Sequence, residues 1–132
     1  MTFNASQQIK TVVRITRRPQ FLYVRDGISF RTRGVFVQAR SRPNRGATHH
    51  IGSGFTATKK IGNAVVRNRS KRRLKAAAAE LLPQYGLPGS DYVFGARRDT
   101  ASLAWQRLLD DMESALISLA AKLKQDKNQV TE

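Results

Sequence analysis

The stretch GNAVVRNRSKRRLKAAAAELL, residues 62–82, decides the fold of this chain. On a helical wheel with about 100° per residue, its apolar and small side chains gather in one narrow stripe. Asn63 is a suitable N-cap for such a helix, and Pro83 predicts that the helix ends near Leu82. The stripe consists of Val66, Ser70, Leu74, Ala77 and Leu81. We therefore expect a long amphipathic helix that docks on a sheet through this stripe.

Cations occupy most of the remaining surface of this helix. Six of the nine residues from Arg67 to Lys75 are Lys or Arg. Like charges four residues apart repel, as Arg67 and Lys71 do, so a ligand of high negative charge would relieve the repulsion. Lys59 and Lys60 precede the helix and, with the free N–H groups of its first turn, could hold a phosphate. A solvated basic face that only aids solubility is the alternative, and it is disfavoured because no acids are interleaved.

The same imbalance extends over the whole first half of the chain. The 132 residues hold 24 Lys and Arg against 9 Asp and Glu, a net charge of +15. Residues 1–75 carry 18 cations and one acid, Asp26, hence +17, whereas residues 76–132 carry 6 cations and 8 acids, hence −2. Arg outnumbers Lys by 16 to 8, and Arg binds phosphate bidentately and stacks on bases. Nucleic acid is therefore the leading partner. An anionic membrane surface is disfavoured, since it would require bulky apolar anchors on the basic helix.

Length and composition exclude several other classes of protein. A chain of 132 residues suits one domain, for which we expect a core over residues 15–122, a flexible arm over 1–13 and a tail over 124–132. The chain has no Cys, which excludes disulfides, thiolate metal sites and a Cys nucleophile. No apolar run approaches the ~18 residues of a membrane span, and the N-terminus lacks the apolar core of a signal peptide. We expect a cytoplasmic protein with no membrane contact and no obligate protein partner.

Weaker patterns place the other elements. We expect a helix over residues 17–26, with Pro19 in its first turn and Gly27 after its end. Strands are expected over residues 28–40, 54–58 and 91–96. A last helix that begins near Thr100 or Ser102 has an apolar stripe formed by Trp105, Leu108, Leu109, Met112, Leu116, Leu119 and Leu123. This order predicts an α+β or α/β sandwich, a small mixed sheet of about four strands packed by three helices.

The run KKIGNAVVRNRSKRRLK, residues 59–75, resembles the signature of the protein subunit of bacterial ribonuclease P. The runs GFTATKK and DYVFGAR resemble further strands of that family, so the likeness covers roughly residues 15–122. The resemblance implies a ribosomal-protein-like fold with a β-α-β crossover. It implies removal of the 5′ leader from precursor tRNA, with the chemistry performed by Mg²⁺ bound to a catalytic RNA. The protein would bind that RNA and the single-stranded leader, and lower the Mg²⁺ requirement.

The resemblance also assigns site residues. Contacts to the catalytic RNA fall to Lys59, Lys60, Asn63, Arg67, Asn68, Arg69, Lys71, Arg72 and Lys75. The cleft that receives the leader falls to Phe21, Phe36, Gln38 and Arg97. Two positions depart from the family pattern. A second cleft aromatic about one turn after Phe21 is missing, where Val24 and Arg25 stand, and Gln38 replaces a frequent Tyr. Phe36 could substitute for the missing rings, and Phe21 belongs either to the cleft or to the core.

Other functions have less support. A nuclease that cuts RNA by itself needs clustered carboxylates for Mg²⁺ or well-placed general acids and bases. Asp26 is the only acid of the basic half, and His49 and His50 are adjacent, so on a strand they would point to opposite faces. Trp105 fits the core stripe of the last helix better than a base-stacking platform. A structural RNA-binding protein, such as a small ribosomal protein, is the alternative function. A DNA-binding module lacks a helix-turn-helix or zinc spacing.

Overall fold

The computed structural model describes residues 11–43 and 49–130, the side chains of 126–130 excepted. Its strands are β1 (Val12–Arg14), β2 (Ile28–Arg31), β3 (Val35–Ser41), β4 (Ile51–Thr56) and β5 (Ser90–Ala96). Its helices are α1 (Arg18–Arg25), the 3₁₀ turn η2 (Lys59–Ile61), α2 (Ala64–Tyr85) and α3 (Trp105–Val130). The predicted mixture of a small sheet and three α-helices is confirmed.

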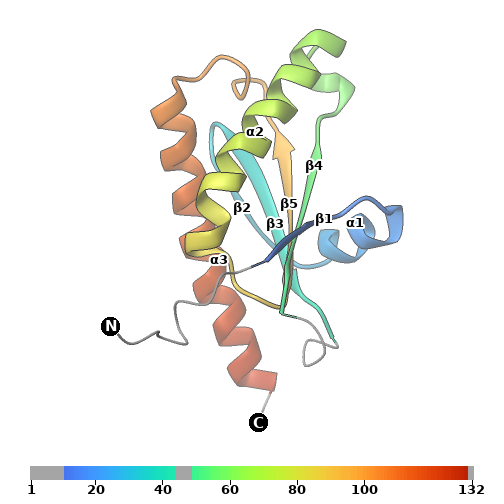
Figure 1. Ribbon diagram of the computed structural model, residues 1–132, viewed down its shortest axis with the longest axis vertical. Helices are drawn as coiled ribbons and strands as arrows, with labels where there is room; N and C mark the ends of the chain where they lie inside the picture. The colour runs from blue at the N-terminus through green and yellow to red at the C-terminus, as the bar shows by residue number, and fades with distance from the viewer. Residues whose placement is uncertain (1–10, 44–48, 131–132) are drawn as a thin grey trace.

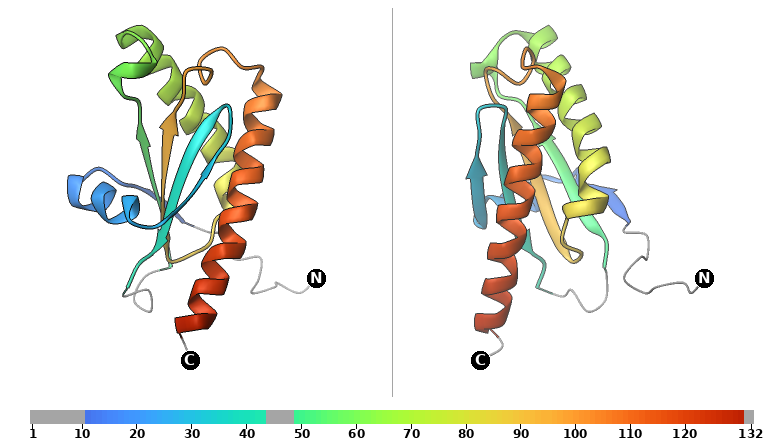
Figure 2. Two further views of the ribbon diagram at one scale, coloured as in Figure 1. Left: turned by 180° about the vertical axis from the view of Figure 1, so that it is seen from behind. Right: turned by 90° about the vertical axis from the view of Figure 1, so that its left-hand side faces the viewer.

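The strands form one mixed sheet in the order β1-β4-β5-β3-β2. Strand β4 runs parallel to both β1 and β5, whereas β3 pairs antiparallel with β5 and with β2. Helix α2 connects the parallel neighbours β4 and β5, which is the expected β-α-β crossover (Figure 1). Helices α2 and α3 cover one face of the sheet, and α1 lies on the other (Figure 2).

The main core lies between the sheet and helices α2 and α3. Alternate residues of β3 point into it, so that Val35 and Val37 are buried while Phe36 and Gln38 are half-buried on the opposite face, as the alternation predicts. The predicted stripe of α2 also packs there, apart from Val66, which is only half-buried. A smaller cluster beneath α1 contains Ile15, Val24 and Val93. The two faces of the sheet are therefore built differently, one covered by two long helices and the other only by a short helix.

The sheet has one strand more than the four expected. Residues 12–14, the first two of which were assigned to the flexible arm, form β1 and pair with β4 in register Val12 to Ile51. The single strand expected over 28–40 is a hairpin of β2 and β3, in which the Thr32 hydroxyl and backbone bind Val35. The two differences have different causes: the partner of β1 lies about forty residues away in sequence, whereas the turn between β2 and β3 is only three residues long and interrupts a β-rich run. Residues 1–10 of the predicted arm lie outside the described residues.

The long helices extend further than predicted. Helix α2 continues through Pro83 to Tyr85, because a proline this near the end removes only one hydrogen bond of the last turn. Helix α3 begins at Trp105, later than Thr100 or Ser102, and reaches Val130, so most of the predicted tail is helical. Trp105 is not a core residue: its side chain is 39% exposed at the start of the helix. The rest of the predicted stripe of α3 is buried.

Candidate nucleic-acid interface

The predicted RNA-binding residues form one continuous segment from η2 into the first half of α2. Gly62 joins the two elements with φ +151°, a conformation that side-chain-bearing residues rarely adopt. Asn63 is the N-cap, as predicted, and its side-chain oxygen accepts from the Val66 N–H at 3.0 Å. Lys59 and Lys60 stand exposed just before this helix start. The turn therefore presents two ammonium groups beside the partial positive charge of a helix N-terminus.

Three arginines of α2 donate to backbone carbonyl oxygens of this chain. Arg67 donates to Gly62 at 2.9 Å, within its own helix start. Arg69 donates through Nε to Ala101 at 3.0 Å, and Arg73 donates to Thr100 and Leu103 at 2.6 and 2.5 Å. The acceptors of Arg69 and Arg73 lie in the loop between β5 and α3. Burial, together with the neighbouring Arg69 cation, lowers the pKa of Arg73. Arg69 and Arg73 therefore fasten α2 to the loop that precedes α3.

The remaining predicted residues of α2 differ in exposure. Asn68 and Arg72 are exposed, whereas Lys71 and Lys75 are half-buried. Within the described residues, none of these cations has a carboxylate within ion-pairing distance. We call the whole set the signature surface: Lys59, Lys60, Asn63, Arg67, Asn68, Arg69, Lys71, Arg72 and Lys75. It offers several uncompensated positive charges to a polyanion.

A second surface, the cleft face, is the side of the sheet that carries α1. Phe21 of α1 packs over Gly54 of β4, where a Cβ would lie only 2.7 Å from its ring. The ring also contacts the small cluster around Val93, and it stays half-buried. Phe21 therefore lies at the border between that cluster and the cleft face, and it is neither wholly core nor wholly free.

Aromatic rings on the cleft face are accompanied by arginines. The Arg31 guanidinium lies 4.8 Å from the ring centroid of Phe36, and that of Arg40 lies 4.2 Å from the ring of Tyr23. Gln38 lies between Phe36 and Arg40 on the same face of β3. Sequence reasoning missed Tyr23, Arg31 and Arg40. The period-two alternation of β3 could have identified Arg40, whereas Arg31 required recognition of β2 as a separate strand.

Arg97 lies away from Phe21, at the end of the sheet where η2 and the loop after β5 meet. It lines a surface pocket of about 400 Å³ together with Lys60, Arg33 and Arg98. Arg33 binds Asp99 at 2.6 Å, and this partner raises the pKa of Arg33. The structure thus places Arg97 beside the signature surface, near Lys60. Phe21 lies over Gly54, whose partner Val93 is four residues before Arg97, about 13 Å along the strand.

The described residues hold no group of three His, Asp or Glu side chains that could ligate a metal ion. No helix in the described part of the chain is long and apolar enough to cross a membrane. His50 is half-buried, and burial followed by the Arg42 cation lowers its pKa. The cations of the signature surface can neutralise phosphates, and the aromatic rings of the cleft face can stack on bases.

A mixed sheet with a β-α-β crossover, a basic helix and an aromatic face define a small α+β protein suited to binding nucleic acid. A sequence model of the ribonuclease P family matches residues 9–120. The chain therefore belongs to the ribonuclease P protein family, whose members are the protein component of the enzyme that processes the 5′ end of tRNA.

Relatives and solved structures agree with this assignment. The ribonuclease P protein component of Caulobacter vibrioides is 50% identical over 110 residues, which cover 83% of this chain and 72% of the relative. That of Ruegeria pomeroyi is 52% identical over 88 residues, covering 66% of this chain and 70% of the relative. The Thermotoga maritima RNase P protein matches with a TM-score of 0.67 at 19% identity, over 80% of this chain and 96% of that one. The Staphylococcus aureus RNase P protein matches with a TM-score of 0.64 at 24% identity, over 78% of this chain and 91% of that one. The last two show that the fold is shared.

Proposed function

We propose that this protein binds the catalytic RNA of ribonuclease P through the signature surface and the 5′ leader of precursor tRNA through the cleft face. The observation that carries the proposal is the set of outward cations on η2 and α2 that lack a carboxylate partner among the described residues. Phosphates would replace those missing partners and release counterions on binding. The assignment of the two surfaces to RNA and leader follows the family resemblance of residues 59–75.

The leader would lie across the cleft face between α1 and β3. Phe21, Phe36 and Tyr23 offer ring surface, and the arginines beside Phe36 and Tyr23 can reach the phosphates of a stacked strand. Stacking on aromatic rings tolerates any base and contributes ~1–3 kcal/mol per base. A subunit that must accept many different leaders needs this kind of recognition.

In the proposed complex, Mg²⁺ is held by the RNA, and the protein contributes positive charge nearby. Cations of the signature surface would lower the repulsion between RNA phosphates and reduce the Mg²⁺ concentration needed for folding and catalysis. The protein would supply no catalytic residue of its own, and it would act in the cytoplasm with its RNA.

A cleavage assay tests the proposal. Precursor tRNA with a labelled 5′ leader is incubated at low Mg²⁺ with bacterial ribonuclease P RNA, with and without this protein, and with the protein alone. We expect cleavage at the mature 5′ end only when RNA and protein are both present. Cleavage by the protein alone would reveal an active site within the chain. Tight, salt-sensitive RNA binding without stimulation would favour a structural RNA-binding protein instead.

A further inference from the structure

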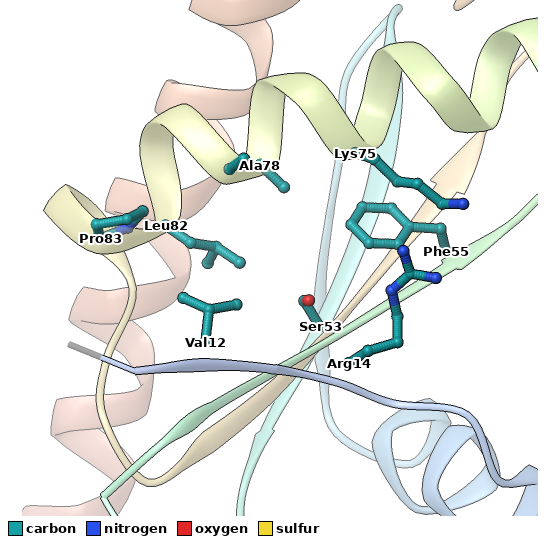
Figure 3. Close-up of a pocket in the computed structure, with 9 residues that line it drawn as sticks. Val12, Arg14, Ser53, Phe55, Lys75, Ala78, Leu82 and Pro83 are labelled. Carbon is teal, nitrogen blue, oxygen red and sulfur yellow. The ribbon is translucent and has the colours of Figure 1, made fainter.

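A pocket of about 400 Å³ opens between the edge strand β1, strand β4 and helix α2 (Figure 3). It lies on the helix-covered side of the sheet, because Ser53 and Phe55 of β4 line it while Gly54 between them faces α1. One end is cationic, and the other is apolar. This pocket is separate from the cleft face, and of its lining residues the family resemblance assigns only Lys75 to RNA contacts.

The cationic end holds two positive groups, Arg14 and Lys75. The Arg14 guanidinium lies 5.4 Å from the ring centroid of Phe55, and that ring stacks in turn on Phe94 at 5.4 Å. This stack holds Arg14 in position over the pocket. Lys75 of α2 extends toward the same ring from above (Figure 3). In the part of the chain that the structure describes, neither Arg14 nor Lys75 has a carboxylate partner, so the end suits an anionic group.

The apolar end is formed by Val12 of β1 opposite Leu82 and Pro83 of α2 (Figure 3). Val12 is 37% exposed although it sits in a strand beside the core. Ser53 contributes a hydroxyl between the two ends. A ligand that matches this layout has an apolar part and, a short distance away, a negative charge. A nucleotide has this composition, with a base at one end and a phosphate at the other.

We propose that this pocket binds one unpaired nucleotide of the RNA subunit, with its phosphate between Arg14 and Lys75 and its base against Val12 and Pro83. The inference rests on the proposed function. The RNA subunit is the source rather than the leader, because Lys75 continues the signature surface along α2, while the proposed leader site lies on the opposite side of the sheet. The RNA interface would then wrap from α2 around the β1 edge of the sheet.

Site-directed crosslinking in the holoenzyme tests the position. The chain has no Cys, so Val12→Cys introduces a single thiol for a photoreactive azidophenacyl group. Val65→Cys, at a 75% exposed position at the start of α2, reports on the signature surface, and Ile117→Cys, at a 49% exposed position on α3, serves as the negative control. With RNA subunit and labelled precursor tRNA present, we expect crosslinks from positions 12 and 65 to the RNA subunit and none from position 117.

The other outcomes separate this inference from the proposed function. A crosslink from position 65 without one from position 12 would overturn the pocket and leave the signature surface intact. A crosslink from position 12 to the leader, or to this chain's own residues 1–10, would refute the assignment of the pocket to a nucleotide of the RNA subunit. Absence of RNA crosslinks from both positions would overturn the pocket and the proposed function together.

Affinity measurements test the chemistry. Arg14→Gln and Lys75→Gln should each weaken binding of the RNA subunit about three- to tenfold and lower the log–log salt slope by about one. Phe55→Leu, which keeps an apolar contact for Phe94 but removes the ring beneath Arg14, should weaken binding in the same direction. Lys122→Gln, at an exposed position of α3, is the matched loss of one charge. Arg14→Gln binding no more weakly than Lys122→Gln would refute the pocket.

Discussion

The two sides of helix α2 use the same kind of residue in opposite ways. On the side toward the loop before α3, Arg69 and Arg73 donate to backbone carbonyl oxygens of Ala101, Thr100 and Leu103. On the outer side, Arg72 is exposed and makes no ion pair among the described residues. One basic signature therefore serves two purposes. Part of it holds the fold together, and part of it is available to a polyanion.

Arg42, which lies outside α2, is the arginine most fully engaged in contacts that stabilise the fold. Arg42 binds Asp91 of β5 at 2.5 Å and donates to the carbonyl oxygen of His50, with side chains only 16% and 7% exposed for the ion pair. The four arginines thus form a series of decreasing engagement in the fold, from Arg42 through Arg69 and Arg73 to Arg72. We expect stability to depend most on the Arg42 end of this series and RNA affinity most on Arg72.

The largest effect on stability is expected for Asp91→Ala. Removing this carboxylate leaves the Arg42 guanidinium in a nearly buried site without its counterion, which costs about 3 kcal/mol of unfolding free energy. Urea denaturation followed by circular dichroism measures the loss. Asp110→Ala, an exposed acid on α3, is the control and should change stability by about 0.5 kcal/mol or less. Equal losses in both variants would show that the Arg42–Asp91 pair is not a structural anchor.

Arg73→Met should cost about 2 kcal/mol of unfolding free energy. The methionine keeps an apolar contact with Trp105 but loses the two hydrogen bonds to Thr100 and Leu103. Hydrogen bonds from a charged donor contribute about 1.5–3 kcal/mol, and the loss is partly offset because the burial cost of the Arg73 cation and its repulsion from Arg69 also disappear. The matched variant Arg72→Met should stay within about 0.5 kcal/mol of the parent. Similar denaturation midpoints for both variants would erase the distinction between the two sides of α2.

The division within α2 was beyond sequence reasoning. Periodicity located the helix, its N-cap Asn63 and its buried stripe, because these depend on neighbours within the helix. The acceptors of Arg69 and Arg73 lie about thirty residues further on, in a loop whose path only the folded chain defines. Trp105 was misplaced for the same reason. Its spacing matches the core stripe, but α3 begins at this residue, and the Arg73 guanidinium lies 5.8 Å from its ring centroid.

Strand β1 was missed because it is short and its partner is distant in the sequence. Three residues, Val12–Arg14, are too few to show an alternation, and their pairing with β4 joins segments about forty residues apart. The cleft face, by contrast, was partly predictable. Phe36 and Gln38 alternate with buried valines along β3, and this alternation is visible in the sequence. The guanidinium groups over Phe36 and Tyr23 come from tertiary contacts, and sequence reasoning did not assign Arg31 and Arg40 to the cleft face.

Affinity for the RNA subunit should follow the outer side of α2. Arg72→Gln is expected to lower the log–log salt slope of binding by about one, because one phosphate contact is lost, and to leave the unfolding free energy unchanged. Arg67→Ala and Arg69→Ala should weaken holoenzyme assembly and also reduce stability, since both residues donate to backbone carbonyls. Filter binding across a salt series measures the slopes. An unchanged slope in all three variants would remove α2 from the RNA interface.

Leader recognition should respond to Phe21 and leave the RNA affinity alone. Phe21→Leu keeps the contact over Gly54 but removes a stacking ring, so we expect KM for precursor tRNA to rise about fivefold, at the lower end of one stacked base. The matched substrate carries a leader of a single nucleotide, for which parent and variant should have the same KM. A rise in the dissociation constant for the RNA subunit without a change in KM would make Phe21 a structural residue only.

The smallest effect is a pH dependence that belongs to the fold. Burial and the Arg42 cation lower the pKa of His50, so protonation is less favourable in the folded chain than in the unfolded one, where the pKa is about 6.5. The stability that neutral His50 contributes is therefore complete above about pH 6.5 and decreases as the pH falls through the lowered pKa. We expect His50→Gln to lose less Tm than the parent between about pH 7.5 and about pH 5. His49→Gln, at the exposed neighbouring position, is the control and should lose as much Tm as the parent. Equal losses of Tm in the two variants would show that His50 does not cause the pH dependence of stability.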